Sequence, residues 1–211
     1  PGPLRHGMTK ATMPVQAGEA PARDTGHEPR LAGDLAVWLI ILAELLAFAI
    51  LFLAFAVSRL RHPDVFAASQ PTLDTSAGLV NTLLLITGSW CVAHAVQAAE
   101  CYGRRTTLRW LVAAQACGAA FVMLKLSEYA DKAAAGIDLE TNVFYMFYFF
   151  LTGFHFLHVL AAMVFLAILT VSVWRSQQMA QQVHGLETGA AFWHMVDLLW
   201  IVLFPLVYVV R

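Results

Sequence analysis

Long apolar runs separated by short polar stretches dominate the pattern of this chain. Five of the runs predict helices that cross a bilayer, because a helix rises about 1.5 Å per residue and the hydrocarbon core is roughly 30 Å thick. We expect these helices over residues 35–57, 79–99, 108–126, 143–174 and 188–210. Only helices or closed barrels can span lipid, and these runs are too long for barrel strands. The pattern therefore predicts an all-α integral membrane bundle of five transmembrane helices.

The segment before the first apolar run has the opposite character. Residues 1–33 are rich in Gly, Pro, Ala and charged side chains, and they contain no apolar core of the length that a signal peptide needs. We expect a flexible N-terminal tail over residues 1–33, followed by one five-helix transmembrane domain over residues 34–211.

Composition supports a membrane protein and excludes several other classes. Of the 211 residues, 59% are hydrophobic and 13% are charged, whereas about 25% of a soluble domain is charged. The net charge of -1 gives no basis for nucleic-acid binding. The three cysteines form no CxxC pair, which argues against a disulfide framework or a zinc site.

The distribution of Lys and Arg predicts an orientation. With five spans, the tail shares one side of the membrane with the loops at residues 100–107 and 175–187, and this side carries the larger share of Lys and Arg. Because basic residues are enriched on the cytoplasmic side, we expect a cytoplasmic N-terminus and an Arg211 on the opposite, outer side.

Ionisable residues interrupt the apolar runs at similar depths. Counting the helical rise from the expected helix ends places them in the cytoplasmic half of the membrane. These residues are Glu44, His94, His155, His158, His194 and Asp197. Ionisable groups in a membrane are costly and usually face protein or a water-filled cavity, so we expect an intramembrane polar network. His184 and Glu187, three residues apart before the last helix, would lie at the cytoplasmic mouth of this layer.

The polar layer has more than one interpretation. Carboxylates and histidines could pair to hold helices together, or the same residue types could bind iron, zinc or manganese. Di-metal helical bundles use about four carboxylates with paired ExxH motifs, whereas this layer has two carboxylates and no ExxH. We therefore favour pairing, and expect Glu44 to contact His158 or His94.

A proton relay through a mid-membrane carboxylate is a third interpretation. The outer half of the membrane shows no evident polar file that would make the chain an independent channel. Lys125 lies near the outer end of the third apolar run, and we expect its ammonium group to reach the interface by snorkelling. Tyr208, near the end of the last run, is expected to be an interface anchor.

The motifs, taken in order, resemble subunit III of the haem-copper oxidase superfamily. The first helix contains AELLAFAILFLAF, with Glu44 at the position of the intramembrane glutamate of that family. The next two segments contain VNTLLLITGSW and KLSEYADKAAAG. The fourth contains FLTGFHFLHV, close to the family pattern TGxHxxHV, and the last contains HGLETGAAFWHMVDLLW, close to HxxE…WHxxDxxW. The resemblance covers residues 33–211 and implies a five-helix form of the bacterial inner membrane, with Arg211 at its periplasmic face.

The resemblance implies that the chain is not an enzyme by itself. It would bind no haem, copper, flavin or other metal, and it would contribute no catalytic residue. Its expected partners are membrane lipids and a large haem- and metal-containing catalytic subunit, whose assembly, stability or proton and substrate access it would support. By residue match, Glu44 and the histidines form the polar core of the family, with His194 and Asp197 as the fifth-helix part.

Within that family, three motifs favour one branch. WHMVDLLWIVLFPLVY, VNTLLLITGSW and the KLSEY ending look most like the branch associated with nitric oxide reductase, which predicts a role in denitrification. The alternative is subunit III of a terminal cytochrome c or quinol oxidase. Position 156 is Phe, where oxidase members usually have Gly. A hypothesis of another class is a stand-alone membrane metalloenzyme with a His/Glu/Asp site.

Overall fold

The long helices of this protein extend further than its apolar runs. The computed structural model describes residues 2, 35–176 and 178–210, so the expected tail lies outside the described residues apart from Gly2. The helices long and apolar enough to cross a membrane are α1 (Leu35–Arg61), α3 (Thr75–Cys101), α4 (Arg104–Ala134), α5 (Val143–Arg175) and α6 (Val183–Phe204). The described part of the chain contains no strand. The predicted all-α bundle of five membrane helices is confirmed.

Short elements connect or end these helices. A corner made of α2 (Pro63–Ser69) and the 3-10 helix η1 (Gln70–Thr72) joins α1 to α3. A second 3-10 helix, η2 (Met179–Gln181), precedes α6, and a π-helix, η3 (Pro205–Val209), follows it.

Local signals explain where the helices begin. The Asp74 side chain accepts hydrogen bonds from the backbone N–H groups of Ser76 and Ala77 at 2.9 and 3.1 Å, which caps α3. Asn142 caps α5 in the same way, through the backbone N–H of Tyr145 at 3.0 Å. Gly103, with a φ of 82°, makes the sharp turn between α3 and α4 that a residue with a Cβ rarely adopts.

The end of α4 differs most from expectation. The predicted span ended at residue 126, but α4 continues to Ala134 because the charged residues after the apolar run are good helix formers. Lys125 therefore lies about 14 Å from the end of its helix, rather than beside it.

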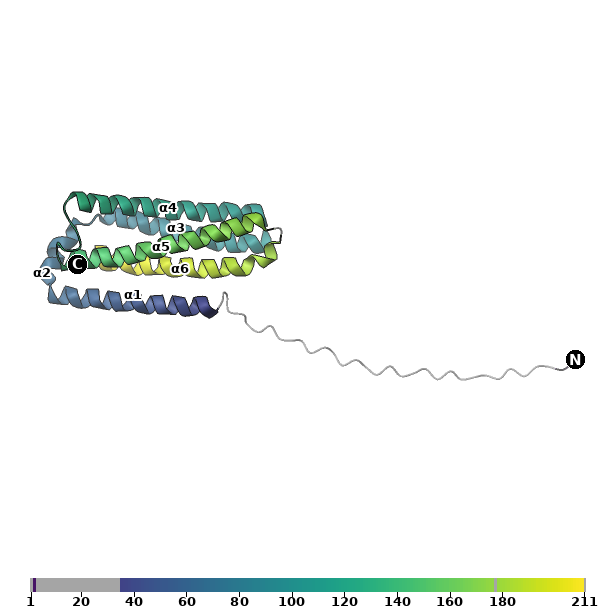
Figure 1. Cartoon of the computed structure of the whole chain (residues 1–211), viewed down its shortest axis with the longest axis horizontal. Coiled ribbons are helices and arrows are strands. Elements are labelled where there is room, and N and C mark those ends of the chain that lie inside the picture. Colours follow the sequence, from purple (N-terminus) through teal and green to yellow (C-terminus); the bar gives the residue numbers. More distant parts are fainter. Residues whose placement is uncertain (1, 3–34, 177, 211) are drawn as a thin grey trace. The chain divides into compact units, whose positions relative to one another are not determined.

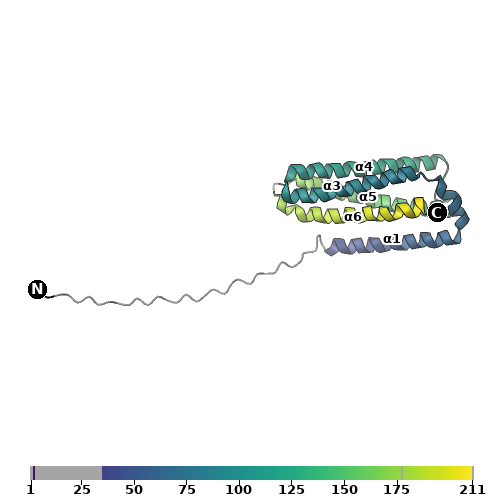
Figure 2. The ribbon, with the colours of Figure 1, turned by 180° about the vertical axis from the view of Figure 1, so that it is seen from behind.

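The helices α3, α4, α5 and α6 lie side by side, and α1 runs along one side of this group (Figures 1 and 2). α1 contacts α6 and α5, while α3 packs most extensively against α4. Large aromatic side chains fill the centre of the bundle, among them Phe48, Phe121, Tyr148 and Trp200, which are fully buried. The core is thus built of aromatic rings contributed by α1, α4, α5 and α6.

Close approach of α3 to the end of α6 depends on Gly78. A Cβ added there would lie 2.6 Å from the Cε2 atom of Phe204. We expect Gly78→Ala to lower the free energy of unfolding by about 1–3 kcal/mol through overpacking, measured by thermal unfolding in detergent. Gly153→Ala in α5 is the matched control, because a Cβ there meets nothing within 4 Å and Ala favours a helix. Equal melting temperatures for the two variants would contradict this packing.

Candidate functional site

Glu44 and His158 form an ion pair between α1 and α5. The Nε2 atom of His158 lies 3.0 Å from the Oε2 atom of Glu44. The Nδ1 atom of His158 lies 2.8 Å from the carbonyl oxygen of Phe154. A carbonyl oxygen only accepts, so Nδ1 carries a hydrogen, and Nε2 is left to share one proton with the Glu44 carboxyl group. The pair is neutral overall whichever partner holds that proton, which makes it tolerable in a membrane.

His155, one turn before His158, has different surroundings. It is fully buried, and its ring centroid lies 5.0 Å from that of Trp200 and 5.9 Å from that of Phe121. Neither ring nitrogen has a hydrogen-bond partner among the described residues. The structure therefore places His155 among aromatic rings and gives it no bond to the Glu44 pair.

The polar residues of α6 contact α3. The Nδ1 atom of His194 lies 2.5 Å from the Oγ atom of Ser89. Asp197 is buried on the same helix and also interacts with the Ser89 side chain. Ser89 therefore connects both ionisable residues of α6 to α3.

The other residues of the predicted layer lie apart. His94 stacks on Trp110 at 5.0 Å between centroids and meets the edge of Trp90 at 4.4 Å. His184 is exposed and Glu187 is half-buried at the start of α6, and no side-chain hydrogen bond of either is found within the described residues. Across the described residues, the predicted layer thus consists of separate contacts and is not one hydrogen-bonded chain.

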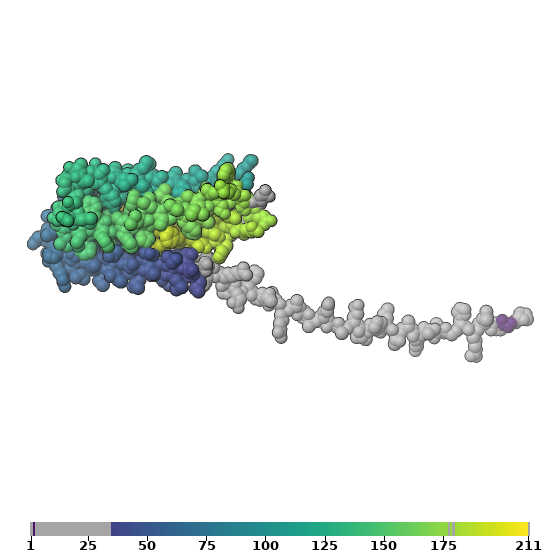
Figure 3. All heavy atoms as spheres, in the orientation of Figure 1, coloured from purple at the N-terminus to yellow at the C-terminus, as the bar shows by residue number. Residues whose placement is uncertain are grey.

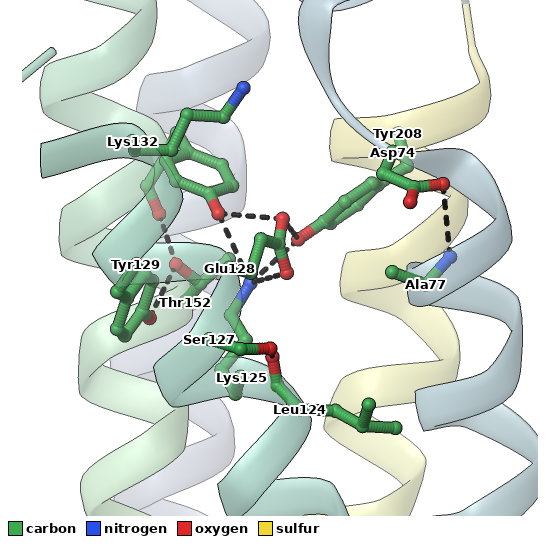
Figure 4. Close-up of polar contacts among 12 residues, drawn as sticks. Asp74, Ala77, Leu124, Lys125, Ser127, Glu128, Tyr129, Lys132, Thr152 and Tyr208 are labelled. Atoms are coloured by element: carbon green, nitrogen blue, oxygen red, sulfur yellow. Dashed lines mark hydrogen bonds and ion pairs between the residues drawn. The ribbon is translucent and has the colours of Figure 1, made fainter. Parts of the chain in front are cut away.

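A second polar cluster lies in the opposite half of the bundle, where no polar file was expected. It consists of Lys125 and Glu128 on α4, Tyr148 on α5 and Tyr208 on η3. Figure 4 shows Lys125, Glu128 and Tyr208 pointing toward one another. The Lys125 ammonium group donates to Oε2 of Glu128 at 2.9 Å and to the Tyr208 hydroxyl at 2.6 Å. The hydroxyls of Tyr148 and Tyr208 donate to Oε1 of Glu128 at 2.7 and 2.8 Å.

The expectation that Lys125 snorkels to the interface is wrong. Its side chain is 0% exposed, because it faces the bundle interior, and α4 continues beyond it to Ala134. Its Nζ atom lies 4.9–5.6 Å from the ring centroids of Tyr129, Tyr148, Trp200 and Tyr208. These rings attract the cation, and Glu128 neutralises it. One signal was present in the sequence, since a Lys and a Glu three residues apart are neighbours on a helix.

Tyr208 reaches the cluster through a change of helix type. Pro205 has no N–H to donate, and from Pro205 to Val209 the chain forms a π-helix. Tyr208 is 4% exposed, so the expectation of an interface anchor is also wrong. The Gln70 side chain donates to the carbonyl oxygens of Val207 and Val210 at 3.1 and 2.7 Å. The segment from Val207 to Val210 is therefore held both by the buried cluster and by the α2–η1 corner.

The geometry gives no support to a metal centre. Nowhere in the described part of the chain do three or more His, Cys, Asp or Glu side chains gather as ligands of one ion would. Glu44 meets a single histidine, and His194 meets a serine. The arrangement can neutralise charge and hold protons, and it joins helices.

Comparison with known proteins decides the family. The family model described as cytochrome c oxidase subunit III matches residues 30–210. The chain belongs to this family. The predicted membership of the haem-copper oxidase subunit III family is therefore confirmed.

Its relatives cover most of the chain. Cytochrome c oxidase subunit 3 of Thermostichus vulcanus is 32% identical over 198 residues, which are 91% of this chain and 94% of the relative. Cytochrome c oxidase subunit 3 of Synechocystis is 35% identical over 196 residues, covering 90% and 80% of the two chains. Cytochrome bo(3) ubiquinol oxidase subunit 3 of Pseudomonas aeruginosa is 27% identical over 195 residues, covering 90% and 93%. These names are those of oxidases, and they do not support the nitric oxide reductase branch.

The buried lysine cluster makes a stability prediction. We expect Lys125→Met to lower the free energy of unfolding by about 3–5 kcal/mol, because it leaves the Glu128 carboxylate buried without its cation. The double variant Lys125→Met/Glu128→Leu should recover most of this loss. Chemical denaturation in detergent, followed by circular dichroism, measures both.

Lys132→Met is the matched control for that experiment. The Lys132 ammonium group donates to the carbonyl oxygen of Thr72 at an exposed position, so its loss should cost about 1 kcal/mol or less. A Lys125→Met variant as stable as the control would show that the cluster contributes nothing.

The Glu44–His158 pair predicts coupled mutational effects. In a double-mutant cycle with Glu44→Gln and His158→Phe, we expect an interaction energy of about 0.5–3 kcal/mol in thermal or chemical unfolding. A second cycle, with Glu44→Gln and His94→Phe, should be additive within about 0.5 kcal/mol, because these two residues do not contact each other. Equal coupling in both cycles would refute a specific pair.

Proposed function

We propose that this chain is the non-catalytic subunit III of a terminal respiratory oxidase of the haem-copper type. The observation that carries the proposal is the subunit III family match, which extends over residues 30–210. The relatives named above are subunits of cytochrome c and ubiquinol oxidases, and they match at least nine-tenths of this chain.

In this proposal the haem and metal chemistry belongs to a large partner subunit. The geometry of the described residues is consistent with that division, because Glu44, Lys125 and His194 contact one or a few neighbouring side chains and do not converge on a shared ligand position. The chain would support assembly, stability under turnover, and proton or substrate access. The Glu44–His158 contact, at 3.0 Å between α1 and α5, is consistent with a structural role or a proton-holding role in that support.

We place the protein in a bacterial inner membrane. The excess of Lys and Arg supports an orientation with the start of α1 and the α3–α4 turn on the cytoplasmic side. In this orientation the α1–α2 corner, the Lys125 cluster and η3 lie toward the periplasm.

Nitric oxide reductase is the second candidate, and the motifs WHMVDLLW and KLSEY are the observation that favours it. Phe156 stands where oxidase members of the family usually have Gly, and its ring packs 6.1 Å from that of Tyr129, so the packing at this position differs from theirs. The reaction of the intact complex separates the candidates, since one consumes O₂ and the other NO.

Purification from the native membrane tests the proposal. With an affinity tag on this chain, we expect a large haem-containing subunit to co-purify and the complex to consume O₂ with reduced cytochrome c or a quinol as donor. Deletion of this chain should lower activity or complex stability without abolishing the reaction, because the reacting centre lies in the partner.

Two results would contradict the proposal. One is recovery of the tagged chain without any haem-containing subunit. The other is stoichiometric iron, zinc or manganese in the isolated chain that disappears in a His155→Ala/His158→Ala variant, which would instead establish a stand-alone metalloenzyme. NO consumption without O₂ consumption would select the second candidate.

A further inference from the structure

The helix α1 buries few side chains for its length. Its buried residues are Ile41, Phe48 and Phe55, whereas α3, which also has 27 residues, buries ten. Figure 3 shows the blue surface of α1 along one edge of the bundle, beside the green surface of α5. Apolar contact contributes little to helix association in a membrane, because lipid tails are as apolar as the side chains. The position of α1 therefore depends strongly on its polar contacts.

Two polar contacts between α1 and the rest of the bundle lie far apart along the helix. Glu44 pairs with His158 in its first half. Arg59, near its other end, donates from Nη1 to the carbonyl oxygen of Val210 at 2.5 Å. The distance along the helix from Glu44 to Arg59 is about 22 Å. Arg59 thus holds a part of α1 that the Glu44–His158 pair does not reach.

The carbonyl group that accepts this bond is itself fixed from two directions. From the α2–η1 corner, Nε2 of Gln70 donates to the carbonyl oxygen of Val210 at 2.7 Å. Two residues before Val210, the Tyr208 hydroxyl donates to Oε1 of Glu128 at 2.8 Å. Tyr208 is buried, so this bond is strengthened by its low-dielectric surroundings. The segment Pro205–Val210 therefore connects the buried core to both the corner and α1.

We propose that the segment Pro205–Val210 is a latch that fixes the position of α1, with the Lys125 cluster as its anchor. While Tyr208 is bonded in the cluster, the carbonyl oxygen of Val210 is held where Arg59 meets it. When Tyr208 leaves the cluster, that oxygen moves, and α1 is freed at this end and swings away from α5.

The latch acts on the Glu44–His158 pair from a distance. Release of one end of α1 changes the separation between Glu44 and His158, which lie on the two helices that move apart. Tyr208 is therefore a positioning residue for a pair that it does not touch. The inference goes beyond the proposed function, because it concerns this chain alone and does not depend on the partner.

The α2–η1 corner offers a competing explanation of how α1 is held. It follows α1 directly in the chain, and it is tied to the start of α5 by contacts of Thr72 with Tyr145 at 2.6 Å and of Asn142 with Ser69 at 3.0 Å. These neutral hydrogen bonds are only partly buried, and bonds of that kind have a modest net value. The anchor of the latch is buried and includes charged partners, which favours the latch.

Distance measurements between two spin labels test the latch. The labels replace Leu60, exposed near the end of α1, and Leu126, exposed on α4, in the full chain in lipid vesicles with the exposed Cys101 changed to Ser. With the latch intact we expect one distance. Each of three variants that interrupt successive links should add a second, longer distance: Arg59→Gln, Gln70→Leu and Tyr208→Phe.

Tyr148→Phe is the matched control. Tyr148 also donates to Oε1 of Glu128, at 2.7 Å, but it lies on α5 and not on the latch, so its variant should keep the single distance. Arg59→Lys retains a donor for the carbonyl oxygen of Val210 and should keep the single distance as well.

The Glu44–His158 pair supplies a second measurement that a general loss of stability would not change. In a Tyr208→Phe background, the coupling in the Glu44→Gln/His158→Phe cycle should fall toward additivity. In a Tyr148→Phe background the coupling should persist.

Two results would overturn the latch. One is a single, unchanged distance in all three link variants, which would show that the corner alone holds α1. The other is an equal effect of Tyr148→Phe and Tyr208→Phe on the distance or on the coupling. Neither result bears on the proposed function, which the co-purification experiment decides separately.

Discussion

The cost of an ionisable group in hydrocarbon is the constraint on which the rest of this structure depends. The bundle meets it in three different ways. Glu44 and His158 share one proton and remain neutral at the edge of α1 and α5. Lys125 and Glu128 are enclosed with two tyrosine hydroxyls. His194 and Asp197 are tied to Ser89 on the neighbouring helix. Each of these arrangements joins two or more helices. The contacts that neutralise the charges are therefore also contacts that hold the bundle together.

This dependence explains the unusual end of the chain. Tyr208 completes the cluster around Glu128, and it can do so because the chain widens into a π-helix at Pro205. The Gln70 side chain donates hydrogen bonds to the carbonyl oxygens of Val207 and Val210, which have no helical partners at the end of η3. A proline that would normally weaken a helix here brings its last turn into the most polar part of the core.

The Lys125 cluster and the Glu44–His158 pair differ in how completely the bundle covers them. Lys125 has its hydrogen bonds satisfied inside the chain, with donors and acceptors matched. The Glu44 pair is partly open, on the helix that contacts the rest of the bundle along one side only.

Sequence alone determined the number and class of the helices, because a bilayer imposes a minimum length on every apolar run. It also placed Glu44 and the histidines by depth and suggested the Glu44–His158 contact, since depth follows from counting residues along a helix. Counting says nothing of how each helix is rotated about its axis. It therefore could not show that His94 and His155 turn toward aromatic rings, or that the layer divides into separate contacts. The apolar pattern also could not show that α4 continues to Ala134, eight residues beyond its apolar run. Lys125 was therefore expected at the interface, whereas its side chain is buried. Tertiary packing decided these facts. A charged residue can continue any helix, but its side chain is buried only where other helices supply hydrogen-bond and charge partners.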